Sequence, residues 1–113
     1  MLGSPEDGSV QIAHSHCLSD DDARQRVVAL TDYWSTRYAM TGAWKGERYQ
    51  ISGKTKGIRF DAVFSLAPGR VEVAVEVPFF ARKIGRDYVE RKLRDYLDPA
   101  RSLADLQARL LAP

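Results

Sequence analysis

The sequence has very little cysteine and no marked excess of positive or negative charge. Cys17 is the only cysteine in 113 residues, which excludes an internal disulfide and fits a reducing cytoplasm. Seventeen basic residues face 15 acidic ones, and the net charge is +2. So balanced a charge argues against nucleic acid as the partner, although a basic helix face and the lysine-rich turn at residues 53–57 would suit phosphate contact.

Long apolar runs are absent too. No stretch approaches the roughly 20 residues needed to cross a bilayer, so we expect no transmembrane segment. The first ten residues, MLGSPEDGSV, have neither the basic nor the apolar region of a secretion signal. We therefore expect a cytoplasmic protein in which residues 1–9 are disordered and residues 10–113 form a single α+β domain.

Motifs for nucleotide binding, metalloprotease chemistry and serine hydrolysis are also missing, since no GxxxxGK[ST], GxGxxG, HExxH or GxSxG pattern occurs. We accordingly expect no cofactor and assign no catalytic residue. One cluster of reactive side chains remains, in HSHC at residues 14–17. His14, His16 and Cys17 are weak candidates for metal ligands, because the two histidines share one side of an extended strand and Cys17 lies on the other.

Cys17 is also a candidate nucleophile, with a histidine as its base. The positive end of the helix that follows favours a thiolate there, and the aspartates at positions 20–22 oppose it. No third group that would orient the base is evident. The favoured interpretation is structural: one histidine is hydrogen-bonded at the strand end, the other is exposed, and Cys17 is buried beside Leu18.

Apolar periodicity predicts most of the elements. Residues 10–13 alternate as a short strand, and a helix follows that is capped by Ser19, begun by three aspartates and closed by Gly42. The helix should bury one face, made of Ala23, Val27, Leu30, Trp34 and Tyr38. Further strands are expected at residues 43–52, 58–66 and 71–77, with Gly46 marking a turn or bulge and residues 53–57 and 67–69 forming turns.

After Pro78 the period becomes helical, over residues 79–97. The apolar arc of this helix is wider than one sheet contact needs, and its charged residues are mainly basic. A further helix is appended at residues 98–113, capped by Ser102 and carrying Leu103, Leu106 and Leu110. The surplus apolar surface would be covered by that helix, by a second copy in a homodimer, or by another partner.

These elements predict an α+β fold of two layers, in the order β-α-β-β-β-α with an extra C-terminal helix. An antiparallel meander would pack on the helices, because one apolar sheet face must meet the apolar helix faces. The other sheet face would be wet, and we expect Asp61, Glu72 and Glu76 there as solvated charges rather than as an acid–base pair.

Several segments together resemble one protein family. They are His16-Cys17-Leu18, the step Trp44-x-Gly46, the start Gly57-Ile58, and the strand from Val71 to Val77 that leads to Phe79 or Phe80. In these features residues 10–97 are similar to the putative polyhydroxyalkanoic acid system proteins, which are small granule-region proteins. The first nine and the last sixteen residues lie outside the resemblance.

The resemblance implies a link to the making or use of polyhydroxyalkanoate storage polymer, and for some members a place at the granule surface. No reaction is established for the family, so no catalytic residue is carried over. We expect a non-enzymatic accessory or interaction protein whose partners are the granule surface or granule proteins. The alternative is a small enzyme or ligand-binding domain for a hydroxyacyl-type substrate, with a cleft lined by His14, His16 or Cys17.

Adhesion to an apolar polyester needs an apolar surface, ideally with a charged rim. The candidate interaction surface is Phe79, Phe80 and Ile84, with Arg82, Lys83 and Arg86 as its rim. In the opposing interpretation the two phenylalanines straddle the strand-to-helix corner, one capping the core and the other covered by the C-terminal tail.

Overall fold

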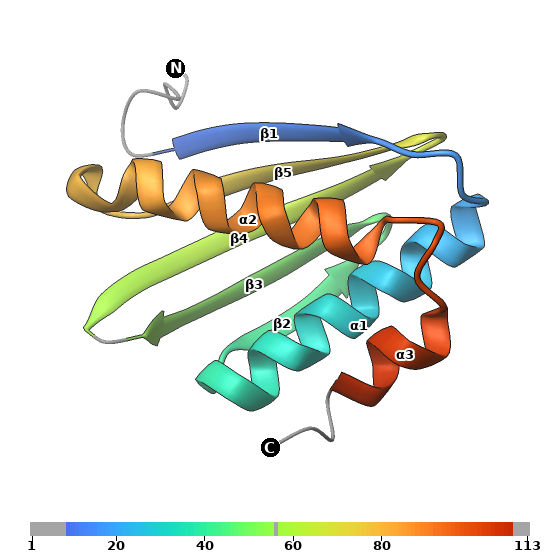
Figure 1. Cartoon of the computed structure of the whole chain (residues 1–113). Coiled ribbons are helices and arrows are strands. Elements are labelled where there is room, and N and C mark those ends of the chain that lie inside the picture. The colour runs from blue at the N-terminus through green and yellow to red at the C-terminus, as the bar shows by residue number, and fades with distance from the viewer. Residues whose placement is uncertain (1–8, 56, 110–113) are drawn as a thin grey trace.

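A computed structural model describes residues 9–55 and 57–109, and Figure 1 shows a five-stranded antiparallel sheet with helices on one face. The strands are β1 (Ser9–Ser15), β2 (Thr41–Lys45), β3 (Arg48–Thr55), β4 (Ile58–Ala67) and β5 (Arg70–Glu76), in the spatial order β1-β5-β4-β3-β2. The helices are α1 (Asp20–Tyr38), the 3₁₀ turn η1 (Phe79–Ala81), α2 (Arg82–Tyr96) and α3 (Leu103–Ala108). The predicted α+β class, with a meander packed on helices, is confirmed. The expected disorder of residues 1–9 falls, except for Ser9, outside the described residues.

The predicted number of strands is wrong by one, because residues 43–52 do not form a single strand. Gly46 has a φ of 66° and lies in the turn of a hairpin between β2 and β3. Both arms of the hairpin are long enough to pair, so the sheet gains β2 as an edge strand. The observed order is therefore β-α-β-β-β-β-α-α.

Two glycines that the sequence places at chain reversals lie inside strands instead. The chain reverses at Ala39, which follows α1 with a φ of 55°, and Gly42 belongs to β2. A Cβ on Gly42 would collide with the hydroxyl group of Tyr49, and one on Gly53 in β3 would lie 2.7 Å from Cγ of Met40. Both glycines therefore permit close packing, which periodicity does not reveal.

The core lies between the inner sheet face and the apolar faces of α1 and α2, and Trp34 is at its centre. The indole ring centroid of Trp34 lies 5.6 Å from that of Phe60, 5.7 Å from that of Phe64 and 6.2 Å from that of Tyr88. The predicted buried face of α1 is confirmed at Ala23, Val27, Leu30 and Trp34, and Tyr38 is half-buried. Within the described residues, no helix combines the length and the apolar character needed to span a membrane.

The two long helices approach each other at one end of the sheet and diverge at the other (Figure 1). They meet where α1 begins and α2 ends, and Arg26 holds this closed end. Its guanidinium is buried and donates to the carbonyl oxygens of Tyr96 at 3.1 Å, Asp98 at 2.9 Å and Arg101 at 2.8 Å, while its Nε donates to Asp22 at 3.0 Å. Because the last carbonyl groups of a helix have no partner within it, Arg26 satisfies groups that α2 and the following turn leave open.

The short helix α3 completes the closed end. Ser102 caps it as predicted, since the hydroxyl oxygen accepts a hydrogen bond from the amide of Asp105 at 3.1 Å. Leu106 is buried against the core, whereas Leu110 lies outside the described residues. Asp95 of α2 forms ion pairs with Arg101 and Arg109, which tie α2 to both ends of α3.

Arg26→Met should lower the free energy of unfolding by about 3 kcal/mol or more, because three carbonyl oxygens and a carboxylate lose a buried partner. Chemical denaturation followed by circular dichroism measures the loss. Arg37→Met, at an exposed position of the same helix, is the matched control and should cost less than about 1 kcal/mol. Equal losses in the two variants would contradict the role given to Arg26.

Asp95→Asn should weaken the protein in a pH-dependent manner. Burial alone would raise the pKa of the Asp95 carboxyl, but the hydrogen bond and charge of Arg109, together with Arg101, outweigh it and hold that pKa below its usual value. The carboxylate therefore adds stability at neutral pH, and this contribution is lost as pH falls through the lowered pKa. Thermal melts over a pH series should show a gap between variant and wild type that closes in acid; a gap independent of pH would count against the ion pairs.

Candidate functional site

Three large apolar side chains are exposed at the corner between β5 and α2, and we call Phe79, Phe80 and Ile84 the corner patch. Their exposed fractions are 79%, 74% and 74%. Pro78 precedes η1, and this tight turn buries Ala81 while it leaves both phenylalanine rings outside. The interpretation in which one of the rings caps the core is therefore wrong.

Basic side chains border the corner patch. The guanidinium of Arg82 lies 5.1 Å from the ring centroid of Phe79, and Lys83 and Arg86 are exposed on the first two turns of α2. Lys83 also forms an ion pair with Asp87, at 3.7 Å, on the solvent side of the helix. All six residues of the candidate interaction surface thus lie in η1 and the start of α2, next to one another along the chain.

A cleft of about 330 Å³ opens between the diverging ends of α1 and α2, and we call it the apolar cleft. Trp34 and Tyr38 of α1 line one side and Gly85 and Tyr88 of α2 the other, with Phe60 of β4 between them. Most of its lining is apolar. Both helices lie on the same face of the sheet, and their far ends separate on this side (Figure 1).

Polar groups in the apolar cleft are few and mostly paired. Nε1 of Trp34 donates a hydrogen bond to the hydroxyl oxygen of Tyr88 at 3.0 Å. Burial raises the pKa of Tyr88, with the Trp34 hydrogen bond opposing the rise and the neighbouring Tyr38 adding to it, so the phenol stays neutral. Arg91 is the one charged residue among the described residues that line the cleft, and its guanidinium lies 5.9 Å from the Tyr88 ring centroid.

The reactive side chains that the sequence singles out lie elsewhere, where β1 leads into α1. His14 is half-buried rather than exposed, and burial, with the charges of His16 and Arg94, lowers its pKa. Nδ1 of His16 accepts a hydrogen bond from the amide of Leu18 at 3.1 Å, and its Nε2 is buried without a partner among the described residues. Cys17 is exposed, so its predicted burial beside Leu18 is wrong.

His14, His16 and Cys17 do not form a recognisable site. In residues 9–55 and 57–109, no group of three or more histidine, cysteine, aspartate or glutamate side chains is placed to hold a metal ion. The cavities at the start of α1, along α2, beside Pro78 and between the diverging helices have none of the three in their linings. The enzyme alternative requires such a cleft, and this geometry does not favour it.

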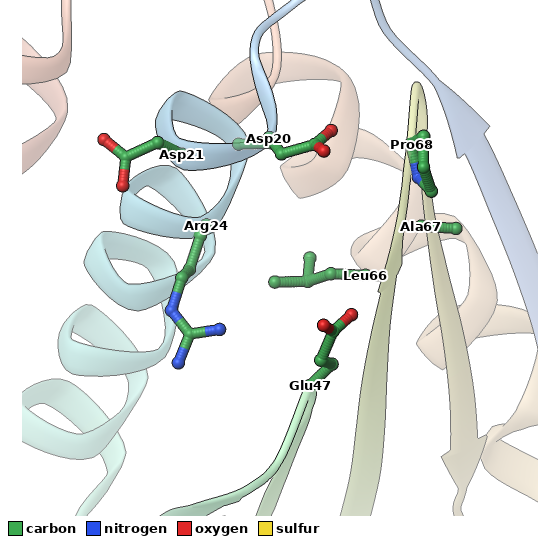
Figure 2. A pocket seen from close by; sticks show the side chains of 8 residues that line it. Asp20, Asp21, Arg24, Glu47, Leu66, Ala67 and Pro68 are labelled. Atoms are coloured by element: carbon green, nitrogen blue, oxygen red, sulfur yellow. The ribbon is translucent and has the colours of Figure 1, made fainter.

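A more polar cavity of about 440 Å³ lies beside the start of α1. Figure 2 shows Asp21 and Arg24 on the helix, Glu47 next to β3, and Leu66 of β4 between them. The guanidinium of Arg24 lies 4.0 Å from the Trp44 ring centroid, and the aspartates of the first turn complement the helix dipole. Arg24 and the aspartates of this cavity thus have roles within the fold.

Two of the three acidic residues expected on the outer sheet face form ion pairs with arginines. Arg59 contacts Asp61 at 3.0 Å, and Arg70 contacts Glu72 at 2.8 Å. Asp61 lies opposite Glu76 in the register of β4 and β5. Each arginine lies on the same strand as its carboxylate partner, two residues away. This arrangement is typical of solvated charges on an exposed sheet face rather than of an acid–base pair.

Comparison with known proteins gives one family. The model of the family described as putative polyhydroxyalkanoic acid system protein matches residues 10–100. Among solved structures, the crystal structure of TTHA0849 from Thermus thermophilus is similar at 14% identity, over 92% of this chain and 97% of that chain, with a TM-score of 0.36. No curated protein matches the chain.

Gly85→Ala should raise the stability of the protein. A Cβ at Gly85 would lie 3.6 Å and 3.8 Å from the two methyl carbons of Val77, an ordinary contact, and alanine favours a helix over glycine by about 1 kcal/mol. Thermal denaturation should therefore show a higher midpoint for the variant. Gly42→Ala is the control and should lower the midpoint, because its Cβ meets Tyr49. A destabilised Gly85→Ala variant would mean that packing requires the glycine.

Proposed function

The chain belongs to the putative polyhydroxyalkanoic acid system protein family, and on this premise we propose that it is a non-enzymatic accessory protein of polyhydroxyalkanoate storage-polymer metabolism. In this proposal it works in the cytoplasm at the surface of storage granules and contacts the polymer through the corner patch. The observation that carries the proposal is the joint exposure of Phe79, Phe80 and Ile84 at one corner.

The chemistry of the corner patch suits an apolar polyester. Full transfer of one such side chain from water to an apolar surface is worth roughly 1.5–3 kcal/mol. Three of them on adjacent turns can touch one surface together, while the exposed charged ends of Lys83 and Arg86 remain in water at the rim and the half-buried Arg82 lies beside Phe79. Exposed apolar side chains gathered in this manner are typical of interaction surfaces.

The reactive residues favour an accessory role over an enzymatic one. His14, His16 and Cys17 lie where β1 leads into α1, and the corner patch lies where β5 leads into α2. A reaction on the polymer would need reactive groups next to the surface that contacts it. The described residues of the corner offer arginines, a lysine and apolar side chains, which bind but carry no evident nucleophile or base.

Replacing both rings should remove granule binding. We expect Phe79→Asp together with Phe80→Asp to reduce co-sedimentation with poly(3-hydroxybutyrate) granules by roughly tenfold or more, because two apolar anchors become charges. Circular dichroism should show that the variant remains folded, since both positions are exposed. Binding is measured as the protein fraction that pellets with washed granules.

The control adds the same two charges elsewhere. Gln50→Asp together with Ala104→Asp alters exposed positions on the outer sheet face and on α3, and should leave co-sedimentation unchanged. The corner patch could instead bind another copy of the chain. Sedimentation equilibrium of the same samples tests this by measuring whether the protein is a monomer or a dimer. If Phe79→Asp with Phe80→Asp turns a dimer into a monomer and granule binding persists, the corner patch is a dimer interface and the proposal is wrong.

A further inference from the structure

The corner patch does not account for the apolar cleft, although Ile84 borders both. The volume of about 330 Å³ falls at the lower end of the roughly 300–1,000 Å³ found for small-molecule sites. The Trp34 and Tyr88 rings stack at 6.2 Å and are joined by their hydrogen bond, which fixes the two helices relative to each other beside the cleft. The site is therefore preformed, and its lining suits an aliphatic chain.

The glycine at position 85 is not explained by the needs of the fold, and this suggests that the free space it leaves in the cleft has a function. Glycine inside a helix weakens it relative to alanine, so its presence needs a cause. At Gly85 the backbone φ is not in the left-handed region, and an added Cβ would make only ordinary contact with Val77. Neither conformation nor packing demands glycine there. What the missing side chain does provide is free space along the α2 wall of the cleft, which a bound molecule would fill.

The positive charge of Arg91 at the cleft would favour a bound molecule with a negatively charged group. Its side chain is exposed at the cleft, and it forms no ion pair with any described residue. The sequence of α2, RKIGRDYVERKLRDY, has six basic residues against three acidic ones, so the helix as a whole carries a net positive charge. A carboxylate at this point would receive charge-assisted hydrogen bonds from the guanidinium.

We propose that the apolar cleft binds a medium-chain aliphatic carboxylic acid, with the chain beside Trp34, Phe60 and Gly85 and the carboxylate at Arg91. The apolar lining accounts for the chain, the glycine for the space, and the guanidinium without an ion pair for the acid group. This binding is separate from granule adhesion and does not depend on it. The two are also separable by mutation, because Phe79 and Phe80 do not line the cleft.

Octanoate is the probe for the test, and Trp34 is the reporter. In a Trp44→Phe background Trp34 is the remaining tryptophan, and it lines the cleft. Octanoate should change its emission in a saturable manner, and isothermal titration calorimetry on the wild-type protein should give the same affinity. Nuclear Overhauser effects between the octanoate chain and the Trp34 and Phe60 rings should place the ligand in the cleft without any variant.

Two substitutions divide the site into its parts. Gly85→Leu fills the cleft and should abolish the binding of octanoate and of the uncharged probe octan-1-ol. Arg91→Met should weaken octanoate about tenfold, because a charge-assisted contact is lost, and leave octan-1-ol unchanged. Arg94→Met removes an exposed charge from the same helix outside the lining and serves as the matched control, with no effect expected on either probe.

The proposal is overturned if octanoate fails to bind the folded wild-type protein at millimolar concentration, or if the Overhauser effects place it outside the cleft. It is equally overturned if folded Gly85→Leu binds octanoate as the wild type does, or if Arg91→Met has no more effect than Arg94→Met. Gly85→Leu should still co-sediment with granules. Loss of granule binding in the Phe79→Asp and Phe80→Asp variant, with octanoate binding retained, would confirm that the two sites are independent.

Discussion

The packing of the Trp34 indole is the interaction on which the core depends. The end of the helical layer where α1 and α2 diverge, which we call the open end, depends on it too. It is buried between β4 and α2, within ring-contact distance of Phe60, Phe64 and Tyr88. So large a ring keeps α1 and α2 apart at this level, whereas Arg26 draws the other ends together by binding the carbonyl groups beyond α2. Trp34 therefore keeps the helices apart at the open end, and Arg26 holds them together by hydrogen bonds at the closed end.

The two ends of the helical layer therefore differ in character. The open end has the apolar cleft and, next to it, the corner patch, so its surface is largely apolar with basic groups at the edge. The closed end has the caps, ion pairs and α3, and its groups are engaged in holding the fold. His16 and Cys17, the most reactive residues by type, precede α1 on the closed side, and among the described residues they belong to no group of side chains that could hold a metal ion.

Period and composition predict the fold class because they reflect burial directly. The alternation from Val71 to Val77 and the helical spacing from Ala23 to Trp34 correspond to buried faces in the structure. Gly46 is predicted as a turn or bulge, but the sequence does not show that its two flanks are separate paired strands, since a short turn barely interrupts the alternation of residues 43–52. Gly42 is misassigned as the end of the helix. A glycine is required there because a side chain would collide with Tyr49 on the neighbouring strand, a contact that the local sequence pattern does not show.

The candidate sites are predictable only in part, for a similar reason. Phe79 and Phe80 stand out in the sequence because they follow Pro78 where the period changes, but their exposure depends on how η1 turns. The apolar cleft is set by the angle between two helices far apart in sequence, and Gly85 has no meaning until Val77 is seen beside it. Arg26 lies at the margin of the apolar face predicted for α1, and its buried role is not evident until its partners, some seventy residues later, are known.

The central claim, that the open end faces the polymer, is tested most directly by hydroxyl-radical footprinting of the protein free and bound to granules. Mass spectrometry then reports the oxidation of each exposed side chain. The account predicts that Phe79, Phe80 and Ile84 are protected on granules, while the exposed Cys17 and the side chains of the outer sheet face react as in solution. Protection of Cys17 or of the outer sheet face, with the two phenylalanine rings still oxidised, would contradict it.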